Sequence, residues 1–178
     1  AANIMNHSEH VFLSGKGAEN FAKNRNLEIV NNEYFHTKFR YNQLLNKKGE
    51  DKYGTVGCVA IDVNGNIVAG TSTGGMTNKM PGRVGDSPIL GSGTWAQNNV
   101  CGVSTTGHGE YFIKYQVARE VCARIDYLNL SLSESSTSII NELDNLGAKG
   151  GLISMDNQAN ISAPFNPYID ATTPINSD

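Results

Sequence analysis

Hydroxyl side chains at the ends of three apolar segments are the residues of this chain whose types and spacing could do chemistry. Thr55 opens the first segment, Thr71 and Thr73 close the second, and Thr105 and Thr106 close the third. In an antiparallel sheet, the start of one strand and the end of its hairpin partner lie at the same edge. The spacing therefore predicts that these hydroxyls converge at one end of a sheet, although threonine is also simply a good strand residue.

The loop over residues 78–88, NKMPGRVGDSP, adds charged groups of both signs. Arg83 and Asp86 lie three residues apart among glycines that let the backbone approach a ligand closely. An arginine binds a carboxylate and an aspartate binds an ammonium group, so the pair could hold the free α-carboxylate and α-amine of an amino acid. On residue types alone, a structural ion pair within the loop is an equal alternative.

The elements that must position these residues are predicted from periodicity and turn signals. β-branched and apolar residues flank Asn64-Gly65, a strong hairpin signal, so two strands are predicted on either side of it. A third strand is predicted over residues 100–107. The helix expected after it has one apolar face, made by Ile113, Val117, Val121, Ile125 and Leu128.

A second helix has the clearest boundaries in the chain. It is predicted to begin at a capping box formed by Ser131 and Glu134 and to stop at Gly147. A closing hairpin follows, with strands in GGLISMD and ISAPFN. Hairpins together with paired helices favour an antiparallel sheet covered by helices, which is an α+β fold, over a parallel α/β sheet.

The segment before residue 55 is predicted to be less regular. A short helix is expected over residues 16–26, followed by irregular chain. Residues 39–54, FRYNQLLNKKGEDKYG, are predicted to be an exposed linker, and such a segment is open to cleavage.

Three other patterns could indicate a metal or a cofactor, but each is better explained without one. Cys58, Cys101 and Cys122 are widely spaced among apolar neighbours, which favours buried, reduced thiols. GSGTWA, residues 91–96, fits the permissive dinucleotide fingerprint but has no strand before it. His7 and His10 have a metal-binding spacing, but no third ligand is apparent nearby.

Composition narrows the classes of partner. The net charge is −3 and there is no block of Lys or Arg, so nucleic acid is not expected as a partner. No apolar run approaches the roughly 20 residues that a membrane helix needs. The first residues, AANIMNHSEH, lack the regions of a signal peptide, so a cytoplasmic protein is expected.

Two stretches carry a resemblance to a known family. GTVGCVAIDVNGNIVAGTSTGGMTNKMPGRVGDSP, from residue 54, and STTGHGEYFIK, from residue 104, closely resemble the plant-type or type-2 L-asparaginases. These are also called isoaspartyl peptidases and belong to the N-terminal nucleophile (Ntn) hydrolase superfamily. The resemblance runs to Asn166. Glycosylasparaginases share GRVGDSP but fit GTVG and GGMTNK less well.

The resemblance implies a precursor that cuts itself between Gly54 and Thr55. The Thr55 hydroxyl would attack the preceding carbonyl, and the freed α-amine would later serve as its base, which makes a histidine unnecessary. By the same resemblance, Thr73 orients the nucleophile, and Arg83 and Asp86 bind the substrate's α-carboxylate and α-amine. Thr106 and Gly107 would form the oxyanion hole, and Gly109 would contribute a further substrate-binding position.

The resemblance also implies an assembly. Residues 1–54 correspond to the end of an α subunit and residues 55–178 to a β subunit, which would pair and form an (αβ)2 dimer with an αββα sandwich fold. The expected substrates are asparagine or β-aspartyl dipeptides. Family members continue beyond both ends of this sequence, and their structural sodium loop lies in the preceding part. A truncated, catalytically inactive chain that only binds a partner is therefore an alternative.

Overall fold

The structure is a computed structural model that describes residues 1–45 and 54–166. The chain divides into two compact units, Ala1–Glu50 and Asp51–Asp178. Every residue with a predicted chemical role from Gly54 to Gly109 belongs to the second unit. The tail after residue 166 and part of the predicted linker lie outside the described residues.

The first unit is helical. It contains α1 (Ala2–His7), α2 (Gly15–Asn24), the 3-10 helix η1 (Asn32–Phe35) and α3 (Lys38–Leu45). Helix α2 confirms the helix predicted over residues 16–26. Residues 39–45 of the predicted linker belong to α3 and are mostly exposed, and KFRYNQLL contains no glycine or proline to interrupt a helix. The linker itself stays a prediction.

A hairpin opens the second unit, as the sequence predicts. Strands β1 (Thr55–Ile61) and β2 (Ile67–Thr73) pair antiparallel, with Thr55 opposite Thr73. Gly65 has a φ of +83°, which glycine adopts without strain, and the Asp62 carboxylate accepts hydrogen bonds from the backbone N–H of Asn64 and Asn66. The turn therefore sets the register that places the two threonines side by side.

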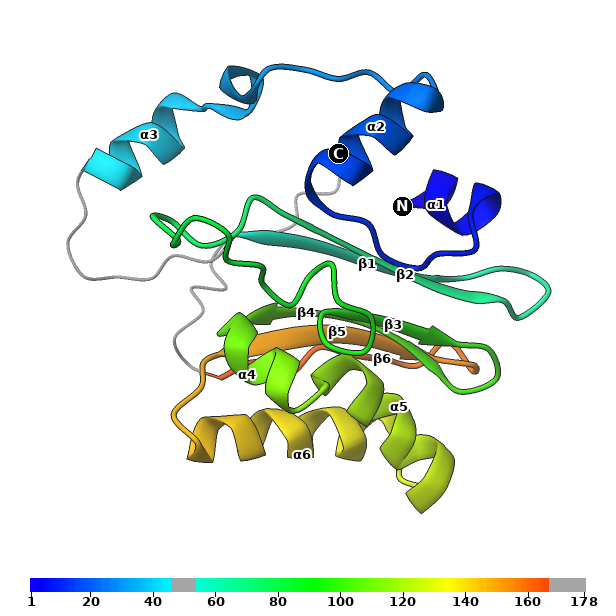
Figure 1. The fold of residues 1–178 in the computed structure, drawn as a ribbon. Helices are drawn as coiled ribbons and strands as arrows, with labels where there is room; N and C mark the ends of the chain where they lie inside the picture. Colours follow the sequence, from blue (N-terminus) through cyan, green and yellow to red (C-terminus); the bar gives the residue numbers. More distant parts are fainter. Residues whose placement is uncertain (46–53, 167–178) are drawn as a thin grey trace, which may run out of the picture. The chain divides into compact units, whose positions relative to one another are not determined.

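A second, four-stranded antiparallel sheet lies beside the hairpin (Figure 1). Its order is β3 (Thr94–Gln97), β4 (Cys101–Gly107), β5 (Gly150–Asp156) and β6 (Ile161–Ser162). Strands β4, β5 and β6 confirm the predicted strands. Strand β3 was not predicted, because its four residues follow a glycine-rich loop and are too few to show an alternating pattern.

Helices α4 (Gly109–Lys114), α5 (Val117–Leu128) and α6 (Leu132–Asn145) follow β4. Helix α6 has the predicted capping box, in which Ser131 and Glu134 exchange hydrogen bonds. The single helix predicted before it is broken at Gln116, whose φ is +48°. The Gln116 amide donates to Ser92 Oγ at 2.8 Å and to the Ile113 carbonyl at 3.0 Å, which holds the break.

The core of this unit lies between the four-stranded sheet and the helices. Figure 1 shows α5 and α6 on one face of that sheet and the β1–β2 hairpin on the other. Strand β4 is the buried centre, and Val103, Phe112 and Val121 are fully inaccessible to solvent. On the hairpin side, a Cβ on Gly102 would come within 2.7 Å of Val59, so the two sheets approach each other closely. This approach brings the ends of β1, β2 and β4 together.

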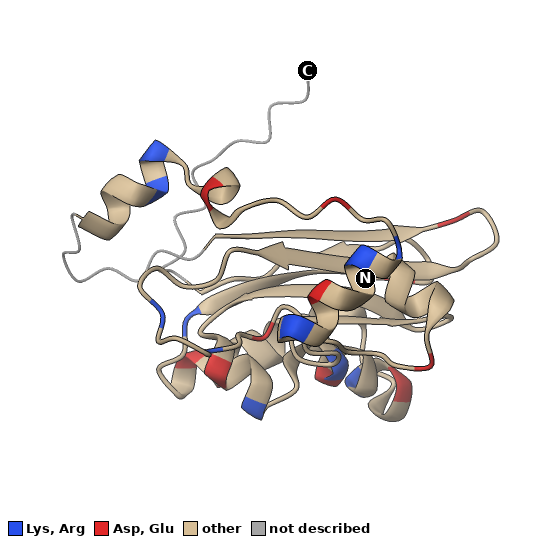
Figure 2. Ribbon diagram, turned by 45° about the horizontal axis from the view of Figure 1, so that its top comes forward, with Lys and Arg blue, Asp and Glu red and all other residues tan. Residues whose placement is uncertain are grey.

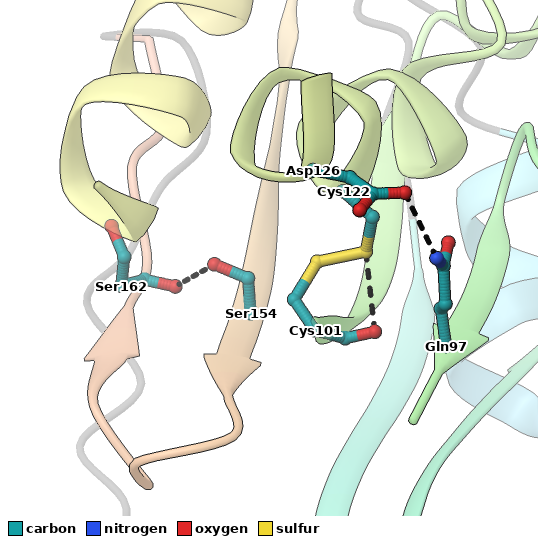
Figure 3. The surroundings of a disulfide bond; sticks show 6 residues. All are labelled: Gln97, Cys101, Cys122, Asp126, Ser154 and Ser162. Atoms are coloured by element: carbon teal, nitrogen blue, oxygen red, sulfur yellow. Dashed lines mark hydrogen bonds between the residues drawn. A yellow bond between two sulfur atoms is a disulfide. The ribbon is translucent and has the colours of Figure 1, made fainter. Parts of the chain in front are cut away.

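The cysteine prediction is wrong in two respects. Cys101 and Cys122 form a disulfide that joins the start of β4 to α5, with 5.6 Å between their Cα atoms (Figure 3). Cys58 is a free thiol and is exposed. The sequence separation of 21 between the paired cysteines concealed the bond, because only the packing of α5 on β4 brings them together.

We expect thiol counting to report this bond. Alkylation of the denatured protein without reductant should label one cysteine per chain, and reduction should raise the number to three. A Cys58→Ser variant serves as the control and should show no label before reduction. Mass spectrometry measures the label, and three labelled cysteines without reductant would contradict the disulfide.

Helices α4 and α5 carry charges of both signs, whereas the charged residues of α6 are all acidic; Figure 2 colours these residues. Arg124 on α5 donates both Nη atoms to the Glu142 carboxylate on α6, each at 2.7 Å, and its Nε to Glu120. This ion pair fastens α5 to α6. Within residues 1–45 and 54–166, no helix has both the length and the apolar character needed to cross a membrane.

Candidate active site

The scissile position predicted from the sequence lies at the end of the hairpin. Thr55 Oγ1 is 3.4 Å from Thr73 Oγ1, and Thr73 Oγ1 lies 2.8 Å from the Gly54 carbonyl oxygen. The single Thr73 hydroxyl proton can be donated to that carbonyl, while its oxygen accepts from Thr55 and from the Gly75 backbone N–H. One side chain thus contacts both the predicted nucleophile and the carbonyl that it would attack.

Hydroxyl groups of Thr71, Thr94 and Ser104 connect this end of the hairpin to the four-stranded sheet. Thr71 shares a hydrogen bond of 2.6 Å with Ser104 on β4 and also bonds to Thr94 on β3. Gly57, opposite Thr71 in the hairpin, has no room for a Cβ because Ser104 fills that space. Since alternate residues of a strand share a face, Thr71 and Thr73 project toward the same side. The hydrogen bond between Thr71 and Ser104 therefore helps to set the position of Thr73 relative to β4.

A cavity of about 370 Å³ opens beside the two threonines. Its wall includes Gly54, Thr55, Thr73, Arg83, Asp86 and Gly107. The volume is within the range of small-molecule sites. Hydroxyls from the hairpin and charged residues from the loop, which lie in separate segments of the sequence, therefore meet in one cavity.

Asp86 is the buried charge of this cavity, with 6% of its surface exposed. Thr105 Oγ1 lies 3.1 Å from its carboxylate oxygen Oδ2 and 3.2 Å from the Ser92 carbonyl. Burial raises the pKa of the Asp86 carboxyl above its ordinary value, and the hydrogen bond from Thr105 and the charge of Arg83 partly oppose that rise. An ammonium group entering the cavity would favour the ionised carboxylate.

Arg83 is held in place by a residue that the sequence did not single out. Its Nε and Nη2 donate to the two Glu110 carboxylate oxygens at 2.8 and 2.9 Å. The hydrogen bond from Arg83 lowers the pKa of Glu110 to about 2, so this carboxylate is ionised throughout the neutral range. Because Glu110 lies 27 residues from Arg83, no local pattern could have revealed the pair.

Gly109 lies between the two charged residues of the loop. A Cβ built on it would come within 2.9 Å of Asp86 Oδ1 and 3.0 Å of Arg83 Nη2. A side chain at this position would therefore enter the space that separates the carboxylate from the guanidinium. Its role as a substrate-binding position, implied by the resemblance, stays a prediction.

The two predicted oxyanion-hole residues lie at the end of β4. Gly107 has a φ of +150°, and a Cβ there would collide with the carbonyl of Lys149. Among the described residues that line the cavity, Gly107 is present and Thr106 is not. Thr106 precedes Gly107 in β4 and pairs with Gly151 of β5.

Segment 91–96, which resembles the dinucleotide fingerprint, has a structural role in packing the loop that bears Asp86. A strand, β3, follows its glycines, where a dinucleotide-binding motif requires a helix. A Cβ on Gly93 would meet the backbone of Asp86 and Ser87 at 2.5–2.6 Å. The glycine therefore lets the loop that bears Asp86 pack against the sheet. For His7 and His10, the described residues provide no group of three or more His, Cys, Asp or Glu that could hold a metal.

Comparison with known proteins identifies the family of the chain. The profile of a family described as asparaginase matches residues 1–52 and 45–176. The chain belongs to the asparaginase family. It is 47% identical over 179 aligned residues to the isoaspartyl peptidase of Escherichia coli K12, an alignment that covers 92% of this chain and 56% of that protein.

Relatives from eukaryotes give the same result. The probable isoaspartyl peptidase/L-asparaginase 2 of Arabidopsis thaliana is 36% identical, with 92% of this chain and 60% of that protein aligned. The isoaspartyl peptidase/L-asparaginase of Xenopus laevis is 37% identical, with 92% and 55% aligned. This asparaginase-family chain thus spans little more than half the length of the curated relatives that it matches.

Proposed function

We propose that the chain cuts itself between Gly54 and Thr55 and then acts as an amidohydrolase on asparagine and β-aspartyl dipeptides. The observation that carries the proposal is the position of the Thr73 hydroxyl, within hydrogen-bond reach of both the Thr55 hydroxyl and the Gly54 carbonyl oxygen. The names of the relatives, isoaspartyl peptidase and L-asparaginase, supply the two substrate classes.

Cleavage would proceed through an ester. The Thr55 oxygen attacks the Gly54 carbonyl carbon, and Thr73 donates a hydrogen bond to the carbonyl oxygen as it gains negative charge. The bond from that carbon to the Thr55 nitrogen breaks, and the nitrogen takes the proton that the Thr55 hydroxyl gives up, which makes it an amine. Water then hydrolyses the ester, which releases the Gly54 carboxylate and restores the Thr55 hydroxyl.

The new α-amine would be the base in turnover. An α-amine has an ordinary pKa near 7.7–8.0, so part of it is neutral at physiological pH and can accept the hydroxyl proton of Thr55. The Thr55 oxygen then attacks the side-chain amide carbon of the substrate. Ammonia or an amino acid leaves with that proton, and water hydrolyses the acyl-enzyme to aspartate. Thr106 and Gly107 would stabilise the oxyanion in both steps.

Substrate orientation would depend on the charged residues. Arg83, oriented by Glu110, would bind the α-carboxylate, and Asp86 would bind the α-ammonium across the space that Gly109 leaves open. All the reacting groups are protein groups, so we propose that the reaction needs no cofactor.

The assembly is also proposed from the family. Residues 1–54 would belong to the α subunit and residues 55–178 to the β subunit of an (αβ)2 dimer with the Ntn-hydrolase αββα sandwich. Two facing sheets with helices on one outer side support that architecture. Val56 and Val68 on the outer face of the hairpin are 75% and 61% exposed, which suits a further layer in a longer protein. We keep the cytoplasmic location as a proposal that fractionation would test.

The decisive experiment uses the protein at its full natural length. Intact mass should reveal a break before Thr55, and ammonia or leucine should be released from asparagine or β-aspartyl-leucine. Release from glycosylated asparagine alone would favour the glycosylasparaginase alternative. An uncut protein without activity on any of these substrates would favour the inactive alternative.

Binding of the product L-aspartate is expected to weaken as the pH falls. The ionised Asp86 carboxylate attracts the ligand's ammonium group. Because the pKa of Asp86 is raised, the carboxylate becomes protonated, as the pH falls, at a pH above the ordinary aspartate pKa of about 3.9, and the attraction is then lost. An Asp86→Asn variant should bind roughly 10- to 100-fold more weakly at pH 7, as expected for a lost charged hydrogen bond.

Calorimetry at pH 7.5 to 4.5 measures both effects. The Asp86→Asn variant should lose most of the pH dependence seen in the unaltered protein, since the titrating carboxyl is gone. Asp62→Asn, in the hairpin turn, is the matched control and should titrate like the unaltered protein. An equal pH dependence in all three proteins would exclude Asp86 as the ammonium site.

A further inference from the structure

Lys79 is a cation at the wall of the candidate active site to which the proposed function gives no role. Its Nζ donates a hydrogen bond of 2.9 Å to the carbonyl of Gly74, the residue that follows Thr73. It also lies over Gly75, which has a φ of +83° and no room for a Cβ on that side because Nζ occupies the space. The ammonium is therefore fixed in the turn that carries Thr73.

Lys79 also lines a second cavity, of about 640 Å³. It shares Met76, Lys79 and Arg83 with the first cavity. Met80 and Pro81 give it apolar walls. A ligand could thus extend from the threonines, past the ammonium, into a partly apolar space.

Arg83 and Lys79, the two cations that line both cavities, differ in whether a carboxylate pairs with them. Arg83 is paired with the Glu110 carboxylate. Across residues 1–45 and 54–166, Lys79 has no carboxylate partner, and its one hydrogen bond is to a neutral carbonyl. An ammonium has three donors, so Lys79 retains the capacity to bind an anionic group of a ligand.

The two substrate classes differ in the group that lies beyond the scissile nitrogen. Asparagine releases ammonia and has nothing beyond the scissile nitrogen. In a β-aspartyl dipeptide, the carboxylate carbon of the leaving residue is separated from the scissile carbonyl by three bonds, a reach of at most about 4 Å. Arg83 and Asp86 contact only the aspartyl part that both substrates share, so they cannot distinguish them.

We propose that Lys79 binds the C-terminal carboxylate of the leaving residue and that the second cavity receives its side chain. The inference rests on the proposed function. It makes Lys79 a specificity-determining residue that favours β-aspartyl dipeptides with a free C-terminus and an apolar second residue over asparagine. The substrate class is set on the leaving-group side, by one cation.

The test compares three substrates with the full-length, matured protein. These are β-aspartyl-leucine, its C-terminal amide and asparagine. The unaltered protein should prefer the free acid to the amide by about tenfold in kcat/KM, as expected for a partly exposed charge pair. Lys79→Met should lower the ratio of kcat/KM for β-aspartyl-leucine to that for asparagine by a similar factor and abolish the preference for the acid.

Two further variants separate recognition from structure. Lys79→Arg keeps the positive charge and should retain most of the preference for the acid. Lys114→Met, at the exposed end of α4, removes a lysine outside both cavities and should leave both ratios unchanged. Equal losses on all three substrates in Lys79→Met, or no preference for the acid in the unaltered protein, would overturn the inference while the proposed hydrolase activity stands. A full-length protein inert on all three substrates would refute the proposed function itself.

Discussion

Thr55→Ala is expected to leave the bond between Gly54 and Thr55 intact and to reduce turnover by about 10⁴-fold or more, the scale of losing a catalytic nucleophile. Alanine lacks the oxygen that would attack the Gly54 carbonyl, and without cleavage no α-amine is formed to act as the base. Both effects follow from one atom, Thr55 Oγ1, which lies 3.4 Å from Thr73 Oγ1. Denaturing gels and intact mass measure cleavage, and ammonia release measures turnover.

Thr55→Ser is the matched control for this experiment. It keeps the hydroxyl and removes one methyl group, so cleavage should continue at a measurable rate. If Thr55→Ala still separated into two fragments after residue 54, Thr55 would not be the nucleophile of processing, and the proposed mechanism would be wrong.

Thr73→Val is expected to slow cleavage by about 10²- to 10³-fold, the usual cost of removing one donor to a developing oxyanion. Valine has nearly the volume of threonine but cannot donate to the Gly54 carbonyl, which the Thr73 hydroxyl approaches to 2.8 Å. It also removes the acceptor for the Thr55 hydroxyl. The half-time for disappearance of the intact chain, followed by mass spectrometry, gives the rate.

Thr73→Ser retains the hydroxyl and should cleave far faster than Thr73→Val. A circular dichroism spectrum and melting temperature close to those of the unaltered protein would show that the valine variant is folded. Cleavage of Thr73→Val at the unaltered rate would mean that its hydroxyl does not assist the attack, whatever its position in the uncut chain.

The local elements were predictable because their signals lie within a few residues. The Asn64-Gly65 turn and the Ser131 to Glu134 capping box lie where the sequence indicates, and the hairpin register follows from the turn. The break at Gln116 was not predictable, since its cause is a hydrogen bond to Ser92, 24 residues away. The apolar spacing continues across the break and concealed it.

The candidate site was predicted in part for the same reason. Thr55, Thr73, Arg83 and Asp86 stand out by type and by neighbouring glycines, and they line one cavity in the structure. Glu110 and Ser104 did not stand out, because each matters only through a partner from a distant segment. Lys79 belongs to the same loop as Arg83, but no pattern singled it out before its place in the walls of two cavities was known.

By itself the sequence determined the hairpin and the capped helix, whose turn and capping signals act over a few residues, and from their order the α+β class. The cleavage bond before Thr55 was indicated by the family resemblance. Only the tertiary structure decided that Arg83 pairs with Glu110, that Thr105 contacts Asp86, and that Cys101 joins Cys122. These contacts form when β4 is buried between the hairpin and the helices, because that packing brings together residues 19 to 27 positions apart. Packing of this kind is a property of the whole unit, and no short segment encodes it.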